Sequence, residues 1–224
     1  MSSRKIPLVT GEIFHVFNRT VAHEPAFDNK WEIARMLEVI EYYMFDLNPI
    51  RYSKFKTLPI EEKKGFLTKM RENNLKHVEI YSFAIMPNHY HILLKQLSEN
   101  GISKYIGNLQ NSFARYHNIK NNRVGATFQS PFKATLIESD EQFTHVARYI
   151  HLNPLTSLLI KNRDDIFSYA QNSFMDYSSN KPRHFMTTDK LKTFFRSRKK
   201  LVEFTLNQLD YQRKLDRIKH LKID

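Results

Sequence analysis

The order of hydrophobic patterns along the N-terminal part of this chain restricts its fold more than any other feature. Aromatic-rich alternation at residues 12–20 predicts a strand, and apolar residues at helical spacing predict a helix over 30–47. Two adjacent strands, a long helix and a last strand follow, over residues 78–85, 89–95, 102–120 and 132–138. This β-α-β-β-α-β order predicts an α+β fold with an antiparallel, ferredoxin-like sheet.

The remaining segments define the expected domain organisation. Residues 1–160 form the predicted domain, in which residues 50–76 are interpreted as a basic insertion with a short helix after Pro59. A further helix follows the last strand. We expect it to end near Asn153 and Pro154, because the helical conformation is disfavoured for the residue before a proline. Residues 161–224 form the predicted C-terminal extension, which is basic and largely helical in pattern.

The charge of the chain suggests the class of its partner. Its 35 Lys and Arg residues exceed its 23 Asp and Glu residues, so the net charge is +12. Together with 17 Phe and 11 Tyr residues, this charge favours nucleic acid as the partner. The alternative is a protein surface that is basic without binding a polyanion.

Several classes of protein are excluded by what the sequence lacks. It contains no cysteine, which excludes a disulfide scaffold, a cysteine-based zinc site and a thiol nucleophile. It has no apolar run long enough to cross a membrane, and its first residues do not resemble a secretory signal. We therefore expect a cytoplasmic protein without a membrane partner, associated with the nucleoid through its charge.

A pair of histidines is the first candidate for chemistry. His89 and His91 lie two residues apart on a predicted strand, so both imidazoles leave the same face of the sheet. Two such rings can each give one nitrogen to a divalent metal ion. Because the chain has ten histidines, chance also produces such pairs. The alternative is two partly exposed histidines without a metal.

Tyr149 and Asn153 are one helical turn apart, so they share a face of the predicted helix. The Tyr149 hydroxyl could reach a cleft, or the ring could lie at the boundary of the core. Asn153 could give a carbonyl oxygen to a metal site, or it could only terminate the helix before Pro154. Basic residues that could hold phosphates, or could be solvated surface charges, flank these elements: Arg19, Arg115, Lys133 and Arg148.

Four segments taken together resemble a known family. In chain order they are FHVFNRT (14–20), MPNHYHILL (86–94), PFKATLI (131–137) and RYIHLNP (148–154). This order is similar to that of the IS200-like single-tyrosine transposases, and most similar to their REP-associated branch. These enzymes belong to the endonucleases with a His-hydrophobic-His motif. The resemblance covers about residues 10–160.

The resemblance implies an activity and a site. It implies that His89 and His91 bind a divalent metal, Mg²⁺ or Mn²⁺, that Tyr149 is the nucleophile, and that Asn153 stands where the family often has a third ligand. The substrate would be single-stranded DNA next to a hairpin. The tyrosine would attack a backbone phosphate and form a 5′-phosphotyrosine intermediate, which keeps the energy of the cleaved bond for rejoining.

Other functions stay open at this point. A non-catalytic nucleic-acid-binding module with the same fold would stack bases on exposed sheet aromatics such as Phe14, Tyr81 and Phe83. A domesticated transposase would bind DNA without cutting it, and a replication or conjugation initiator would use related chemistry. The sequence does not distinguish a monomer from a homodimer, in which Tyr149 would serve the metal site of the partner.

Overall fold

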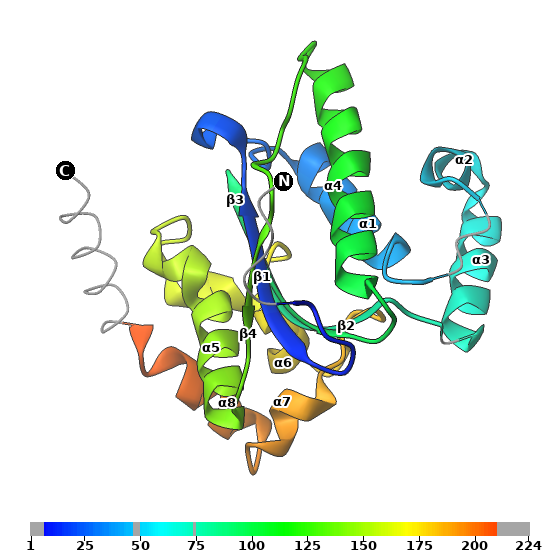
Figure 1. Ribbon diagram of the computed structural model, residues 1–224. Coiled ribbons are helices and arrows are strands. Elements are labelled where there is room, and N and C mark those ends of the chain that lie inside the picture. The colour runs from blue at the N-terminus through cyan, green and yellow to red at the C-terminus, as the bar shows by residue number, and fades with distance from the viewer. Residues whose placement is uncertain (1–6, 47–49, 74, 210–224) are drawn as a thin grey trace.

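A four-stranded antiparallel sheet in the order β2-β3-β1-β4 forms the centre of the computed structural model, which describes residues 7–46, 50–73 and 75–209 (Figure 1). The strands are β1 (Ile13–Arg19), β2 (Val78–Met86), β3 (His89–Gln96) and β4 (Lys133–Leu136). This is the strand order of the ferredoxin-like fold, so the fold that the hydrophobic patterns predict is confirmed.

Helices cover both faces of the sheet. They are α1 (Lys30–Tyr42), α2 (Tyr52–Thr57), α3 (Ile60–Asn73), α4 (Gly101–Lys120), α5 (Asp140–Thr156), α6 (Phe174–Ser178), α7 (Asp189–Thr193) and α8 (Arg198–Leu206), with the 3₁₀ segments η1 (Val21–His23) and η2 (Arg163–Phe167). Figure 1 shows α1 and α4 on one face, and α5 on the other with α6, α7 and α8 nearby. Because both faces are covered, β2 and β3 are buried along almost their whole length. Within the described ranges, none of the helices combines the length and apolar character needed to cross a lipid bilayer.

The segment between α1 and β2 folds against α1. The first helix, expected to run to about residue 47, ends at Tyr42. Phe45 instead forms a β-bridge with Lys76. The helices α2 and α3 then carry Phe55 and Phe66, whose ring centroids lie 4.9 and 6.1 Å from that of Tyr42. The insertion predicted at residues 50–76 is therefore helical in large part and is joined to the domain through aromatic contacts.

The last turn of α5 differs from the expectation. Pro154 lies inside the helix, which continues past Asn153. Because proline has no N–H, the carbonyl of Ile150, four residues earlier, loses its partner within the helix. The side-chain Nδ2 of Asn172 donates to this carbonyl and to that of His151, at 3.1 Å in both cases. The helix therefore includes Pro154 and ends at Thr156, slightly beyond the expected end, because a residue distant in sequence supplies the missing hydrogen bond.

The described part of the C-terminal extension covers the edge of the sheet at β2. Isolated β-bridges join Ile80 to Met186 and Ala84 to Asn172. The guanidinium of Arg183 donates to the carbonyl oxygen of Asn172 at 2.9 Å, and its Cζ lies 4.6 Å from the ring centroid of Phe83 on β2. This segment thus packs against the sheet and contacts α5, which lies on the face of the sheet opposite α4.

Candidate functional site

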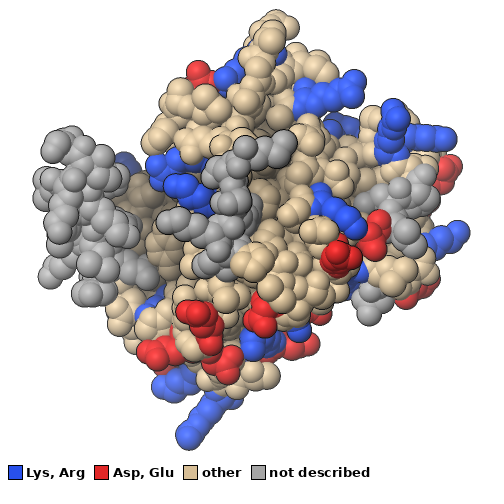
Figure 2. Space-filling model, viewed as in Figure 1, with Lys and Arg blue, Asp and Glu red and all other residues tan. Residues whose placement is uncertain are grey.

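A cleft of about 440 Å³ lies at the end of the sheet where β1 ends and β4 begins, on the face that α5 covers. It brings together five of the residues singled out from the sequence: Tyr149, His89, His91, Arg19 and Lys133. Five further residues line it: His15, Phe17, Asn18, His23 and Gln129. Figure 2 shows Asp and Glu side chains in the lower part and at the right of this view, with Lys and Arg side chains spread over the face.

Strand register explains why these side chains meet. In the antiparallel pair of β1 and β3, Phe17 lies opposite His91 and Arg19 lies opposite His89. Residues opposite each other point to the same face, so all four side chains face α5. Tyr90 points to the other face, where it is fully buried and its hydroxyl accepts a hydrogen bond from Gln110 of α4 at 2.7 Å. The prediction that both histidines share a face is confirmed.

Three rings form the centre of the cleft. His15 Nε2 lies 2.9 Å from His91 Nδ1, and the two imidazoles are stacked with centroids 5.1 Å apart. The ring of Tyr149 meets both edge-on, with centroids 5.6 Å from His91 and 6.2 Å from His15. The tyrosine ring therefore has a defined place beside the histidine pair.

Three histidines of the cleft, His15, His89 and His91, are neutral at pH 7. Burial lowers the pKa of His15 to about 4 and, together with the nearby Arg19 and His23, lowers that of His89 to about 4. Burial also lowers the pKa of His91 well below its usual value, with His15, His89 and Arg19 contributing in the same direction. A neutral imidazole keeps the lone pair that a metal ion needs, so the charge states suit a metal site.

The donor set fits a divalent metal only in part. The two imidazoles supply two nitrogens on one face, and both rings have Nδ1 in contact with a protein partner, Asn88 Oδ1 for His89 and His15 for His91. Within residues 7–46, 50–73 and 75–209, no three His, Asp or Glu residues are grouped so that they could hold a metal. Any further ligands would have to be of another kind, such as water, an amide or a phosphate oxygen.

Asn153 does not line the cleft. It is buried on α5, its carbonyl accepts hydrogen bonds from Ser157, and its side-chain Nδ2 has no hydrogen-bond partner in the structure. Its role as a third ligand stays a prediction that this arrangement of side chains does not itself support.

The four basic residues have different places. Arg19 and Lys133 line the cleft, with Lys133 Nζ 6.0 Å from the ring centroid of Phe17. Arg115 is exposed on α4, on the opposite face of the sheet. The guanidinium of Arg148 lies over the ring of Phe204 on α8, with Cζ 4.3 Å from its centroid, and burial lowers its pKa. Only two of the four are thus placed to meet a substrate in the cleft.

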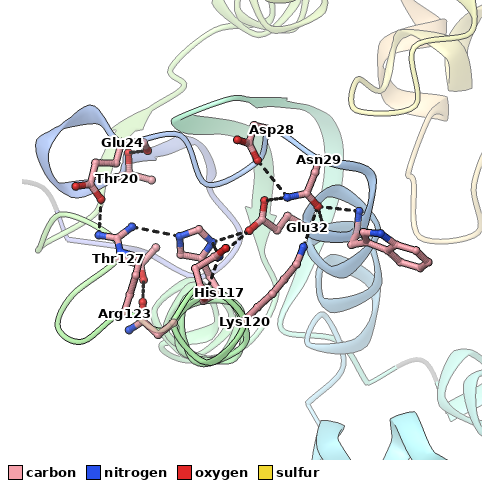
Figure 3. Close-up of polar contacts among 12 residues, drawn as sticks. Thr20, Glu24, Asp28, Asn29, Glu32, His117, Lys120, Arg123 and Thr127 are labelled. Carbon is pink, nitrogen blue, oxygen red and sulfur yellow. Dashed lines mark hydrogen bonds and ion pairs between the residues drawn. The ribbon is translucent and has the colours of Figure 1, made fainter.

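The loop after β1 forms one wall of the cleft and is held rigidly. Its residues Ala22 and His23 have positive φ angles of 54° and 58°, which are unusual for residues other than glycine. Figure 3 shows the polar network behind it, in which Arg123 joins Glu24 of this loop to His117 of α4. These contacts hold the loop against the helices. An unusual backbone conformation persists only when the surrounding structure holds it in this way.

The buried centre of this network is a hydrogen bond between side chains of two helices. His117 Nδ1 of α4 lies 2.8 Å from Glu32 Oε1 of α1, and both side chains are almost fully buried. Asn29, which caps α1 through hydrogen bonds from the backbone of Trp31 and Glu32, also contacts the Glu32 carboxylate (Figure 3). The wall of the cleft is thereby linked to the start of α1 and the end of α4.

Sequence reasoning missed His15, Phe17 and His23. His15 and Phe17 alternate with buried residues on β1, so the register with β3 would have placed them beside His91. His23 lies in a loop whose shape depends on contacts with distant helices, and no local pattern marks it. Phe14, Tyr81 and Phe83, the aromatic residues expected to stack bases in a binding module, are at most 3% exposed and are therefore not available for stacking.

Comparisons with known proteins point in one direction. The family model of the IS200-like transposases matches residues 51–153. A solved structure of a REP-associated tyrosine transposase bound to a REP hairpin is similar in fold, with a TM-score of 0.55 and 12% sequence identity. The match covers 84% of this chain and 92% of that one. No curated protein matches the chain.

Proposed function

We propose that this chain, whose residues 51–153 match the model of the IS200-like transposase family, cleaves and rejoins single-stranded DNA next to a hairpin through Tyr149. The observation that carries the proposal is the common cleft of Tyr149, His89 and His91. The solved relative in fold holds a REP hairpin, which supports a hairpin beside the cleavage position. Such an enzyme would act at the nucleoid.

In the proposed reaction, Tyr149 Oη attacks a backbone phosphorus atom. The phenol loses its proton, the bond between phosphorus and the 3′ oxygen breaks, and that oxygen takes up a proton to leave as a 3′-hydroxyl. The DNA then stays attached as a 5′-phosphotyrosine, and attack by a 3′-hydroxyl reverses the step and rejoins a strand. A phenol has an ordinary pKa of about 10, so the phosphate must be activated for attack at pH 7.

His89 and His91 are the residues that would hold a divalent metal, Mg²⁺ or Mn²⁺. When bound, such an ion supplies charge that polarises the phosphate and offsets the negative charge that develops during attack. Imidazole ligands favour Mn²⁺ in affinity. Asn153 would approach this site only if its side chain turned away from its present buried position.

The walls of the cleft supply binding. Arg19 and Lys133 can each contact a phosphate of the DNA. The partly exposed ring of Phe17, which lies opposite Lys133 in the pairing of β1 with β4, can contact a base. The loop that contains His23 forms another wall of the cleft and limits where the DNA can lie. These side chains orient the phosphate toward Tyr149, which is the main task of a site that transfers a phosphoryl group.

A covalent adduct tests the proposal directly. The protein is incubated with Mn²⁺ and single-stranded oligonucleotides that cover both flanks of its own gene, and adducts that resist SDS are counted. We expect an adduct that is lost in Tyr149→Phe and in the presence of EDTA, and that persists in the control Tyr116→Phe, which alters a tyrosine of α4 outside the cleft.

The outcomes separate the alternatives. An adduct that survives in Tyr149→Phe would refute the assignment of the nucleophile. Tight binding of the oligonucleotides without any adduct would favour a domesticated, binding-only protein.

A further inference from the structure

The side chain of Asn88 fixes the tautomer of His89. Its Nδ2 donates to the backbone carbonyl of His23 at 3.1 Å, and its Oδ1 lies 2.7 Å from His89 Nδ1. A carbonyl can only accept, so the amide nitrogen must face His23 and the amide oxygen must face His89. An oxygen that only accepts requires the hydrogen of His89 to be on Nδ1. The lone pair of the ring is then on Nε2.

The contact between His15 and His91 allows two arrangements. The two ring nitrogens lie 2.9 Å apart, so one of them carries the shared hydrogen and the other accepts it. If His15 donates from Nε2, then His91 carries its hydrogen on its own Nε2 and has no lone pair there. If His91 donates from Nδ1, its Nε2 has the lone pair, as in His89. Only the second arrangement gives two equivalent metal-binding nitrogens on one face.

We propose that Asn88 and His15 are positioning residues that hold His89 and His91 in the tautomer with the hydrogen on Nδ1, so that both rings present Nε2 to one metal ion. This inference rests on the proposed metal role of the two histidines. Hydrogen bonds of this kind from the second nitrogen of a ligating imidazole fix ring orientation and tautomer in metal sites, and their loss typically weakens metal binding by about 10- to 100-fold.

The stacked geometry supports an orienting role for His15. Its ring lies parallel to that of His91 within 23°, and it occupies the position on β1 directly opposite Leu93, two residues beyond His91. The backbone of two paired strands therefore sets the distance between the two rings. Asn88 is fixed in the same way, because it lies in the turn between β2 and β3 and is tied to the loop at His23.

The test measures tautomers and metal affinity separately. In the metal-free protein, ¹⁵N NMR of labelled histidines reports which ring nitrogen carries the hydrogen. Calorimetry with MnCl₂ gives the affinity. We expect the Nδ1–H tautomer for both His89 and His91, and an affinity for Mn²⁺ that falls about 10- to 100-fold in His15→Leu and in Asn88→Leu. His15→Gln keeps an acceptor, so it should restore most of the affinity.

The variant His145→Leu, at an exposed position of α5 outside the cleft, serves as the matched control and should bind Mn²⁺ like the original protein. Thermal unfolding of each variant shows whether a loss of affinity only follows a loss of stability. An Nε2–H tautomer at either histidine, or unchanged affinity in His15→Leu, would overturn the inference. If the original protein shows both Nδ1–H tautomers but binds no Mn²⁺, the positioning holds and the proposed metal function fails.

Discussion

The ring of Tyr149 lies edge-on to the ring of His91, with 5.6 Å between the ring centroids and 88° between the ring planes. Both rings belong to one chain and line one cleft, although 57 positions separate them in the sequence. The tyrosine of a chain is thus already beside the histidine pair of the same chain, without help from a second copy.

This relationship predicts that a single chain carries a complete site. Tyr149→Phe and His91→Ala should each abolish adduct formation, and a mixture of the two inactive proteins should stay inactive. If each site were built from two chains, mixed dimers would contain one intact site and would recover activity. The measurement is the yield of SDS-resistant adduct across a range of mixing ratios, and recovery in the mixture would contradict the prediction.

The affinity for DNA should fall steeply as the salt concentration rises, and Lys133 should contribute to this fall. Each phosphate contact contributes about 0.7 to the slope of log K against log[salt] for single-stranded DNA. Lys133→Ala should therefore lower the steepness by about 0.7, as measured by fluorescence anisotropy with a hairpin oligonucleotide. The matched control is Lys69→Ala on the exposed surface of α3, which should leave the slope unchanged.

Arg148 should behave differently from Lys133, although both were candidates for DNA contact. Its guanidinium packs over Phe204 and ties α5 to α8. Arg148→Ala should lower the free energy of unfolding by about 1 kcal/mol, the value typical of a cation–π contact, and should leave the salt slope unchanged. Urea unfolding and the same anisotropy assay measure the two quantities. A lower slope with full stability would show that Arg148 contacts DNA instead.

The core of the fold and the histidine pair could be predicted because they depend on local periodicity. Alternation along β1 and β3 determines which side chains share a face, and helical spacing in α4 determines its buried stripe. Tyr149 could be singled out because the segments around it resemble a family. In these cases the information lies within a few residues of the position concerned.

The parts that could not be predicted depend on contacts between distant segments. The extension of α5 through Pro154 requires Asn172, and the place of Arg148 requires Phe204. His23 owes its place in the cleft to a loop held by Arg123 and its network. No pattern within one segment contains this information, so propensity alone placed the end of α5 slightly too early.

The hydrogen bonds of Asn172 should be coupled to Pro154. Asn172→Ala leaves the buried carbonyl of Ile150 without a partner, which should cost about 1–3 kcal/mol of stability. In a Pro154→Ala background that carbonyl regains an N–H partner within the helix, so the same substitution should cost less. Urea unfolding of both single variants and the double variant gives the coupling energy. Strict additivity would show that Asn172 acts through its other contacts.

Stability should fall below neutral pH in part because of His151. This residue is fully buried between the rings of Phe174 and Tyr177, with its Nε2 3.1 Å from Ser173 Oγ. Burial lowers its pKa from 6.5 to about 3. Between these values the unfolded chain binds a proton that the folded chain does not. The stability from this group is therefore complete above pH 6.5 and decreases as the pH falls toward 3.

The contribution of His151 can be isolated by removing its titration. One proton corresponds to about 1.4 kcal/mol per pH unit, so His151 should account for a loss of about 2 kcal/mol between pH 7 and pH 5. His151→Gln should lower stability at pH 7 but lose about 2 kcal/mol less than the original protein over this interval. The control is His184→Gln at an exposed position. Equal losses in the original protein and in His151→Gln, measured by urea unfolding at both pH values, would show that His151 takes up its proton without unfolding of the chain.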